Sequence, residues 1–190
     1  QIYGNGNALG YFEESNFTGT EIFITNITGA NNYMGMIAFY LDNSQMALLR
    51  VSMKNIKKIG DFGCVFWLTN STLNLNENSL VNLTEAGGIV GYFSTIVLNR
   101  IIFDNFILLN LENSILKQIY GFVSFQFCDG TLEKSYFRGG YANYGGGVNL
   151  FSNNYNFNSR PFYIKECIFI QNIAGNGAGV YSVNNGLFII

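Results

Sequence analysis

The residues that could do chemistry in this chain are few and stand apart from one another. None of the 190 residues is histidine, so neither a nucleophile with a histidine base nor a Cys/His metal site can be formed. Hydrolysis of a glycosidic bond needs two carboxylates that face each other across it. The aspartates are isolated in the sequence, at Asp42, Asp61, Asp104 and Asp129.

Catalysis would therefore depend on the fold to bring distant side chains together. Neighbouring turns of a repetitive fold could place Asp104 beside Asp129 or Lys134, which would supply an acid and a base for cleavage of an acidic polysaccharide. We keep a polysaccharide-binding or polysaccharide-cleaving protein as the alternative function. The glycine-rich stretches 4–6 and 175–179 lack the strand-loop-helix context of phosphate-binding loops. We expect no catalytic residue, no metal and no cofactor.

The cysteines are spaced too widely for a zinc-binding CxxC pattern, and an odd number leaves one outside any set of disulfides. We expect Cys64, Cys128 and Cys167 to be small buried residues. Their disulfide state and the redox compartment stay open at this stage.

Composition excludes several classes of partner. The net charge is −2 and only 12% of residues are charged, with no basic run longer than Lys57-Lys58, so we expect no nucleic acid and no anionic membrane surface as partners. The hydrophobic share of 48% predicts a packed core. The sequence contains no window of about 18 apolar residues, so it predicts no membrane-spanning helix. Residues 1–190 read as one domain, and we expect them to be an internal part of a longer chain.

The local pattern favours strands throughout. Runs rich in β-branched and aromatic residues, such as EIFITNIT and FYIKECIFI, alternate with Gly and Asn turns. Pro161 is the only proline. An all-β fold is therefore predicted.

An apolar residue two positions after a small residue recurs along the whole chain. Spacings between successive copies run from 25 to 33 residues and average 28, which is a period typical of a solenoid. The anchors that we assign are Gly10, Gly35, Gly63, Gly88, Gly121 and Gly146, with Val65, Val90, Val123, Val148 and Val180.

Asparagine followed by an apolar residue recurs with a similar period. Amides stacked at the same bend of each coil can bond to one another and to the turn backbone. We therefore predict a parallel β-helix of about six to seven coils, spaced about 4.8 Å apart, with an internal amide ladder. Its predicted members are Asn26, Asn55, Asn82, Asn105 and Asn172.

The segment FIQNIAGNGAGVY, residues 169–181, resembles the FxxN…GGAI repeat of the chlamydial polymorphic outer membrane proteins, which are surface-exposed adhesins. Similar repeats are common in large surface proteins of protists. The resemblance implies a right-handed parallel β-helix and an adhesive or structural role at a cell surface. The matching residues are Phe169, Asn172, Ala174, Ala178, Gly179 and Val180.

A leucine-rich solenoid is the rival fold. Residues 73–83, LNLNENSLVNL, fit the LxLxxNxLxxL signature, with a looser echo at 109–113.

Two segments lengthen the coil, at 107–119 and 149–161, and insertions into a solenoid project as loops where binding residues often lie. The second loop combines aromatic and amide side chains that suit a carbohydrate or a protein partner, although a loop without a partner explains it as well. Its candidate binding residues are Phe151, Tyr155, Phe157 and Arg160.

Sequons suggest where glycans could attach in a secreted protein. Asn26 and Asn82 head sequons, but we expect them to point inward and to be poor acceptors. Asn16 and Asn70 lie between the two repeat registers and are the better candidates.

Together these features predict a non-catalytic, structural or adhesive segment of a large extracellular or cell-surface protein. Its predicted partners are further copies of itself, or a cell-surface protein or glycan. Because a solenoid has open strand edges at its ends, head-to-tail assembly into a filament is part of the hypothesis.

Overall fold

The computed structural model describes residues 3–5, 9–30, 36–59, 63–84, 86–107, 121–151, 161–183 and 186–190. In these ranges the regular elements are β-strands, and three seven-stranded sheets hold nearly all of them. The strands pair in parallel in each sheet. The predictions of an all-β fold and of stacked parallel strands are confirmed.

Each large sheet takes one strand from every pass of the chain. Sheet A contains β1 (Tyr3–Asn5), β4 (Phe23–Ala30), β7 (Ser52–Ile59), β10 (Ser79–Thr84), β13 (Ile102–Ile107), β16 (Tyr136–Arg138) and β20 (Ile168–Ile170). Sheet B contains β2 (Gly10–Glu13), β5 (Met36–Asp42), β8 (Gly63–Thr69), β11 (Ala86–Tyr92), β14 (Val123–Gln126), β18 (Val148–Phe151) and β22 (Val180–Val183). Sheet C contains β3 (Asn16–Thr20), β6 (Gln45–Leu49), β9 (Thr72–Asn76), β12 (Thr95–Asn99), β15 (Asp129–Glu133), β19 (Pro161–Lys165) and β23 (Gly186–Ile189). A small fourth sheet pairs β17 (Tyr141–Tyr144) with β21 (Ile173–Asn176).

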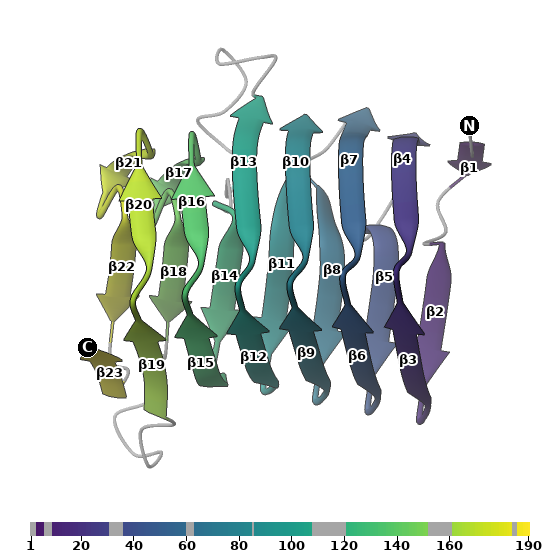
Figure 1. The fold of residues 1–190 in the computed structure, drawn as a ribbon, viewed down its shortest axis with the longest axis horizontal. Helices are drawn as coiled ribbons and strands as arrows, with labels where there is room; N and C mark the ends of the chain where they lie inside the picture. Colours follow the sequence, from purple (N-terminus) through teal and green to yellow (C-terminus); the bar gives the residue numbers. More distant parts are fainter. Residues whose placement is uncertain are drawn as a thin grey trace.

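The chain visits the three sheets in a fixed cyclic order. It runs from β2 in sheet B to β3 in sheet C and β4 in sheet A, and β5 then returns to sheet B beside β2. We call one such passage a coil. Figure 1 shows the coils stacked along the long axis, with the strands of sheets C and A following one another on one face and sheet B behind them. This arrangement is consistent with a parallel β-helix.

Coil length varies while the pairing stays in step. At the corner between sheets B and C, hydrogen-bonded residues of successive coils are separated by 29, 27 and 23 positions, and the paired residues Thr95 and Asp129 that follow are separated by 34. In these coils the variation falls between sheets A and B, and in a later coil the connection lengthens between sheets B and C, where β18 ends at Phe151 and β19 begins at Pro161. Strand β10 ends at Thr84 and β11 begins at Ala86, whereas β13 ends at Ile107 and β14 begins only at Val123. The lengthening that we placed at 107–119 coincides with this longer connection, most of which lies outside the described residues.

The core is built from the inward residues of the alternating strands. In β9 and β12 every second side chain is buried. Phe137 is fully buried and stacks on Phe103 and on Phe169, with ring centroids 4.9 Å apart in both pairs. The leucine-rich alternative is wrong. Leu73 and Leu83 are buried in strands β9 and β10 of two different sheets, so their spacing reflects two inward faces of one coil.

The observed register corrects the alignment of the anchors. Val123, Val148 and Val180 lie in one column of sheet B, as aligned. In the preceding coils the column continues through Ile89 and Phe66, which leaves Val90 and Val65 one residue out of it. The alignment fails there because coil length shrinks to 23 residues, whereas the assumed spacing was 25. Gly63 lies opposite Ala86, Gly10 lies opposite Phe39, and Gly35 is outside the described residues.

Left-handed backbone, where φ is positive, recurs at three positions of the coils in the described ranges. One lies at the corner between sheets B and C, one at the corner between sheets C and A, and one inside the sheet A strand or directly after it. This conformation costs a non-glycine residue roughly 1–2 kcal/mol, and it costs Asn least because its short side chain forms local hydrogen bonds. The third position is occupied by Asn26 (φ 57), Asn55 (φ 56), Asn82 (φ 57), Asn105 (φ 61), Gly139 (φ 73) and Gln171 (φ 53).

Candidate functional site

A left-handed asparagine interrupts each of the long strands β4, β7, β10 and β13. The interruption resets the alternation of side chains. Leu80 and Leu83 are both buried although three positions separate them, and Val81 and Asn82 between them are half-buried. The strand therefore bends at the asparagine without leaving the sheet, because pairing resumes in register at Leu83 and Phe106.

Hydrogen bonds join the amides of these four asparagines into a row. Nδ2 of Asn55 donates to Oδ1 of Asn26 (3.0 Å), Nδ2 of Asn82 to Asn55 (2.9 Å), and Nδ2 of Asn105 to Asn82 (2.8 Å). All bonds run in the same direction. We call these four residues the amide ladder.

The amide ladder lies on the outside of the coil. Asn26, Asn55 and Asn105 are exposed and Asn82 is half-buried. The prediction that Asn26 and Asn82 point inward is wrong, because the left-handed backbone turns their side chains away from the core while the following apolar residue turns in. Neither residue is hidden from a modifying enzyme by the core.

Asn172 is not a member of the amide ladder, which corrects our fifth assignment. The left-handed position of its coil is Gln171, one residue earlier. The half-buried Asn172 instead holds the backbone of the neighbouring coil. Its Oδ1 accepts from the N–H of Gly140 (2.8 Å) and its Nδ2 donates to the carbonyl of Phe137 (3.1 Å).

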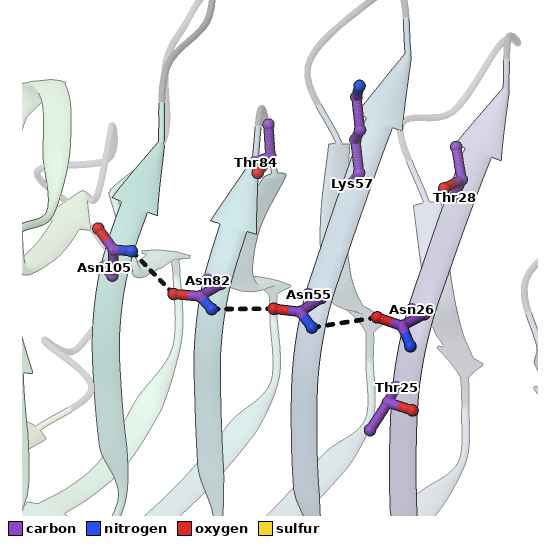
Figure 2. Close-up of a pocket in the computed structure, with 8 residues that line it drawn as sticks. All are labelled: Thr25, Asn26, Thr28, Asn55, Lys57, Asn82, Thr84 and Asn105. Atoms are coloured by element: carbon purple, nitrogen blue, oxygen red, sulfur yellow. Dashed lines mark hydrogen bonds between the residues drawn. The ribbon is translucent and has the colours of Figure 1, made fainter.

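The bend and the ladder together form a shallow groove of about 630 Å³ on sheet A. Figure 2 shows the four amides in a row across β4, β7, β10 and β13, with Thr28, Lys57 and Thr84 on one side and Thr25 on the other. These eight residues define what we call the ladder groove. All of them are polar, so the groove offers amide, hydroxyl and ammonium groups and no apolar pocket.

The aspartates considered for catalysis lie on different sheets. Asp104 in β13 forms two hydrogen bonds with the guanidinium of Arg138, at 2.7 and 2.6 Å, and this carboxylate raises the pKa of Arg138. Asp129 in β15 accepts a hydrogen bond from Oγ1 of Thr95 (2.7 Å). Lys134 pairs with Glu133 (3.1 Å), and the hydrogen bond from Lys134 is the main cause of the lowered pKa of that carboxyl. Asp104 and Asp129 therefore lie in different sheets, and each carboxylate is engaged by a neighbouring side chain.

No group of three or more His, Cys, Asp or Glu side chains in the described ranges could hold a metal ion. In the same ranges no helix is long and apolar enough to cross a membrane.

A second ladder, of hydroxyl groups, was missed by the sequence reasoning. At the corner between sheets B and C, the N–H groups of Ser15, Ser44 and Ser71 donate to the Oγ of Ser44, Ser71 and Ser94, at 3.0 to 3.1 Å. Each serine hydroxyl donates in turn to the carbonyl two residues before it. The signal was available, because the serines repeat with the same separations as the asparagines.

The cysteines are free and partly continue these corners. Sγ of Cys128 lies near the carbonyl oxygen of Gln126 (3.4 Å), the contact that the serine hydroxyls make in other coils. Cys64 is fully buried, and burial raises the pKa of its thiol. Cys167 is half-buried, and burial raises its pKa as well.

The candidate loop and the sequons are only partly described. Phe151 is half-buried at the end of β18, and Tyr155, Phe157 and Arg160 lie outside the described residues. Asn16 is exposed on β3, and Asn70 is exposed at a left-handed corner (φ 47).

No protein-family model matches this chain, and neither a curated protein nor a solved structure matches it.

Proposed function

We propose that the chain is a stretch of a right-handed parallel β-helix of about six to seven coils, and that it serves as a non-catalytic, stiff rod in a large extracellular or cell-surface protein. The handedness comes from the resemblance of residues 169–181 to surface-protein repeats. Stacked parallel strands in three sheets are the framework that such a rod needs.

The observation that best supports the structural role is the row of hydrogen bonds through Ser15, Ser44, Ser71 and Ser94, which we call the serine ladder. It adds a buried line of hydrogen bonds along the axis, beyond those of the sheets. Ser44, Ser71 and Ser94 are each no more than 4% exposed, so breaking their contacts would leave buried donors and acceptors without partners. An unsatisfied buried polar group costs about 1–3 kcal/mol, which resists sliding or opening of one coil against the next.

The exposed corners add charge pairs between coils. Arg50 bonds to Glu21 (2.8 Å) and Arg100 to Glu77 (2.9 Å), all at the corner between sheets C and A. Exposed pairs contribute at most about 1 kcal/mol each. They add a weak attraction between neighbouring coils that salt would screen.

The outer strands of the sheets support assembly as a further part of the proposal. Strands β1 and β20, β2 and β22, and β3 and β23 each have one edge with no strand partner among the described residues. Such an edge accepts another strand readily. A further coil or a second copy of the chain could pair there and extend the rod.

Two assays test this function. Incubation with a panel of neutral and acidic polysaccharides should give no reducing ends and no unsaturated products. Turnover that is lost in Asp104→Asn or Asp129→Asn would contradict the non-catalytic role. Replacement of residues 152–160 by a Gly-Ser linker should keep the far-ultraviolet circular dichroism of the parent. Loss of cell attachment in that variant would identify an adhesin, whereas unchanged attachment would leave the rod without an adhesive loop.

A further inference from the structure

The ladder groove has hydrogen-bonding capacity that none of the described residues uses. An asparagine side chain offers two N–H donors and an oxygen with two lone pairs. Asn55 and Asn82 each spend one donor and one lone pair on the ladder. The second N–H and the second lone pair of both amides have no partner among the described residues, so they remain for a ligand or for water.

The two ends of the amide ladder are different. Because all bonds run in one direction, Asn26 uses only its oxygen and Asn105 only its nitrogen within the ladder. No amide continues the row beyond Asn105, because the next coil has Gly139 at that bend. A ligand along the groove thus meets a donor-rich end at Asn26 and an acceptor-rich end at Asn105.

The walls add hydroxyl groups and one positive charge. Thr28, Lys57 and Thr84 occupy equivalent positions on neighbouring strands, since the pairing of β7 with its two neighbours places Lys57 between the threonines. Lys54 is exposed on the same strand just before the bend. Neither lysine has an ion-pair partner among the residues that the structure describes, while Asp104 is already paired with Arg138.

This lining selects one chemical class of ligand. Peptide grooves need apolar pockets for anchoring side chains, and no apolar side chain lines this groove. Nucleic acid needs a field of many positive charges, which a chain of net charge −2 does not supply. Amides and hydroxyls repeated about every 4.8 Å, beside an ammonium that pairs with no acid in the described ranges, match a linear polyhydroxylated chain that carries acidic groups.

We propose that the ladder groove binds an acidic glycan that lies along the axis of the coils. Its hydroxyl groups form hydrogen bonds with the remaining N–H groups and lone pairs of Asn26, Asn55, Asn82 and Asn105. A carboxylate or sulfate of the glycan pairs with Lys57. This site is independent of the loop at 149–161 and of the rod function.

Calorimetric titration of the native protein tests the site, with mass spectrometry first used to show that Asn26 and Asn82 carry no glycan. The probes are an oligogalacturonate, a sulfated dextran oligosaccharide, a neutral cello-oligosaccharide and an acidic peptide. The two acidic glycans distinguish carboxylate from sulfate as the preferred group. We expect at least one of them to bind more tightly than the neutral glycan, with an affinity that falls as salt is added.

Two variants place the ligand in the groove. Lys57→Gln should weaken binding about tenfold, and Thr84→Val about threefold to tenfold, as expected for one charge-assisted and one neutral hydrogen bond. Lys134→Gln and Thr131→Val remove the same groups at the C–A corner and from sheet C, and they should leave binding unchanged. Four results would each overturn the proposal. These are no binding of either acidic glycan at millimolar concentration, a neutral glycan that binds as tightly, a peptide that binds as tightly, or equal effects of the groove and control variants.

Discussion

The left-handed bend of the sheet A strands differs between the two halves of the molecule, both in the residue that forms it and in the course of the strand after it. In β4, β7, β10 and β13 the bend is an asparagine, the strand continues through it, and the side chain points outward into the amide ladder. In the last two coils the bend is Gly139 or Gln171, and the strand stops there. A separate short strand, β17 or β21, then follows, and the amide of Asn172 bonds inward to the backbone of Phe137 and Gly140.

The comparison teaches that the position of a bend and the role of its amide are set separately. The register of the coils fixes where the chain must turn, because all six bends stay in one column. The neighbouring residues decide what the amide does. Where the strand continues, the apolar residue after the bend fills the core and leaves the asparagine outside. Where the strand breaks, free backbone groups of Phe137 and Gly140 attract an asparagine from the next coil.

The largest loss of stability should come from removal of the aromatic ring of Phe137, which stacks on one ring from each half of the molecule. Phe137→Ala removes a fully buried ring that stacks on Phe103 and on Phe169. We expect a loss of about 3–5 kcal/mol in the free energy of unfolding, as for other buried phenylalanines, measured by urea denaturation. Phe93→Ala is the matched control, since Phe93 is stacked on Phe127 but 49% exposed, and it should lose far less. Equal losses would contradict the assignment of Phe137 to the core.

The inward amide of the last coil should matter next. Asn172→Ala leaves the N–H of Gly140 and the carbonyl of Phe137 without their side-chain partner. A half-buried backbone group left unpaired should lower the free energy of unfolding by about 1–3 kcal/mol. Amide hydrogen exchange should show the loss locally, as faster exchange at Gly140. Unchanged exchange at Gly140 would show that the bond does not form.

The contribution of the amide ladder residues to stability should come more from their tolerance of left-handed backbone than from the hydrogen bonds between their amides. Asn55→Ala places a side chain with no local bonding in left-handed backbone, and it should cost about 1–2 kcal/mol. Asn55→Gly loses the same two ladder bonds but accepts the backbone (φ 56), so it should cost less than about 1 kcal/mol. The two variants are compared by thermal and urea unfolding. An equal cost for both would mean that the exposed bonds, and not the bend, stabilise these coils.

The smallest effect should come from extending the amide ladder across the boundary. At Gly139 an added Cβ would lie 3.7 Å from the Cα of Asn105, which is ordinary contact, and φ is +73. This φ strains most side chains, but asparagine tolerates it best, as at Asn105 (φ 61). Gly139→Asn should therefore fit with little strain, and its Nδ2 could donate to Oδ1 of Asn105. We expect a change in the free energy of unfolding within about 0.5 kcal/mol. Side-chain amide resonances of Asn105 should shift in nuclear magnetic resonance spectra, and an unshifted pair would contradict continuity of the column.

Sequence reasoning reached the class of fold because the same few positions recur in every coil. Parallel stacking requires the inward residue and the bend residue to return at each pass, and the recurrence of Asn26, Asn55, Asn82 and Asn105 records the bend. The anchors in sheet B were partly misaligned because coil length changes between Thr84 and Ala86, upstream of the glycines used for alignment. The columns at the other corners change spacing in step, since the asparagines and the serines both repeat at 29, 27 and 23 positions.

The period of the asparagines does not show whether their amides point into the coil or out of it. An internal ladder and an external one have the same period, and only the backbone torsion at the bend distinguishes them. A usable sign was present in the two apolar residues that flank each asparagine at positions −2 and +1, such as Leu80 and Leu83. Both must face the core, so a regular alternation is impossible and the asparagine between them must turn out. The serine ladder was overlooked because serine occurs in many structural environments, so its recurrence in the sequence is less distinctive than that of asparagine.

Electron microscopy of the native protein tests the central claim of a stiff parallel rod most directly. We predict straight rods or filaments with an axial repeat of about 4.8 Å per coil and a right-handed path of the chain through the three sheets. Compact particles without that axial repeat, or a left-handed path, would contradict the account.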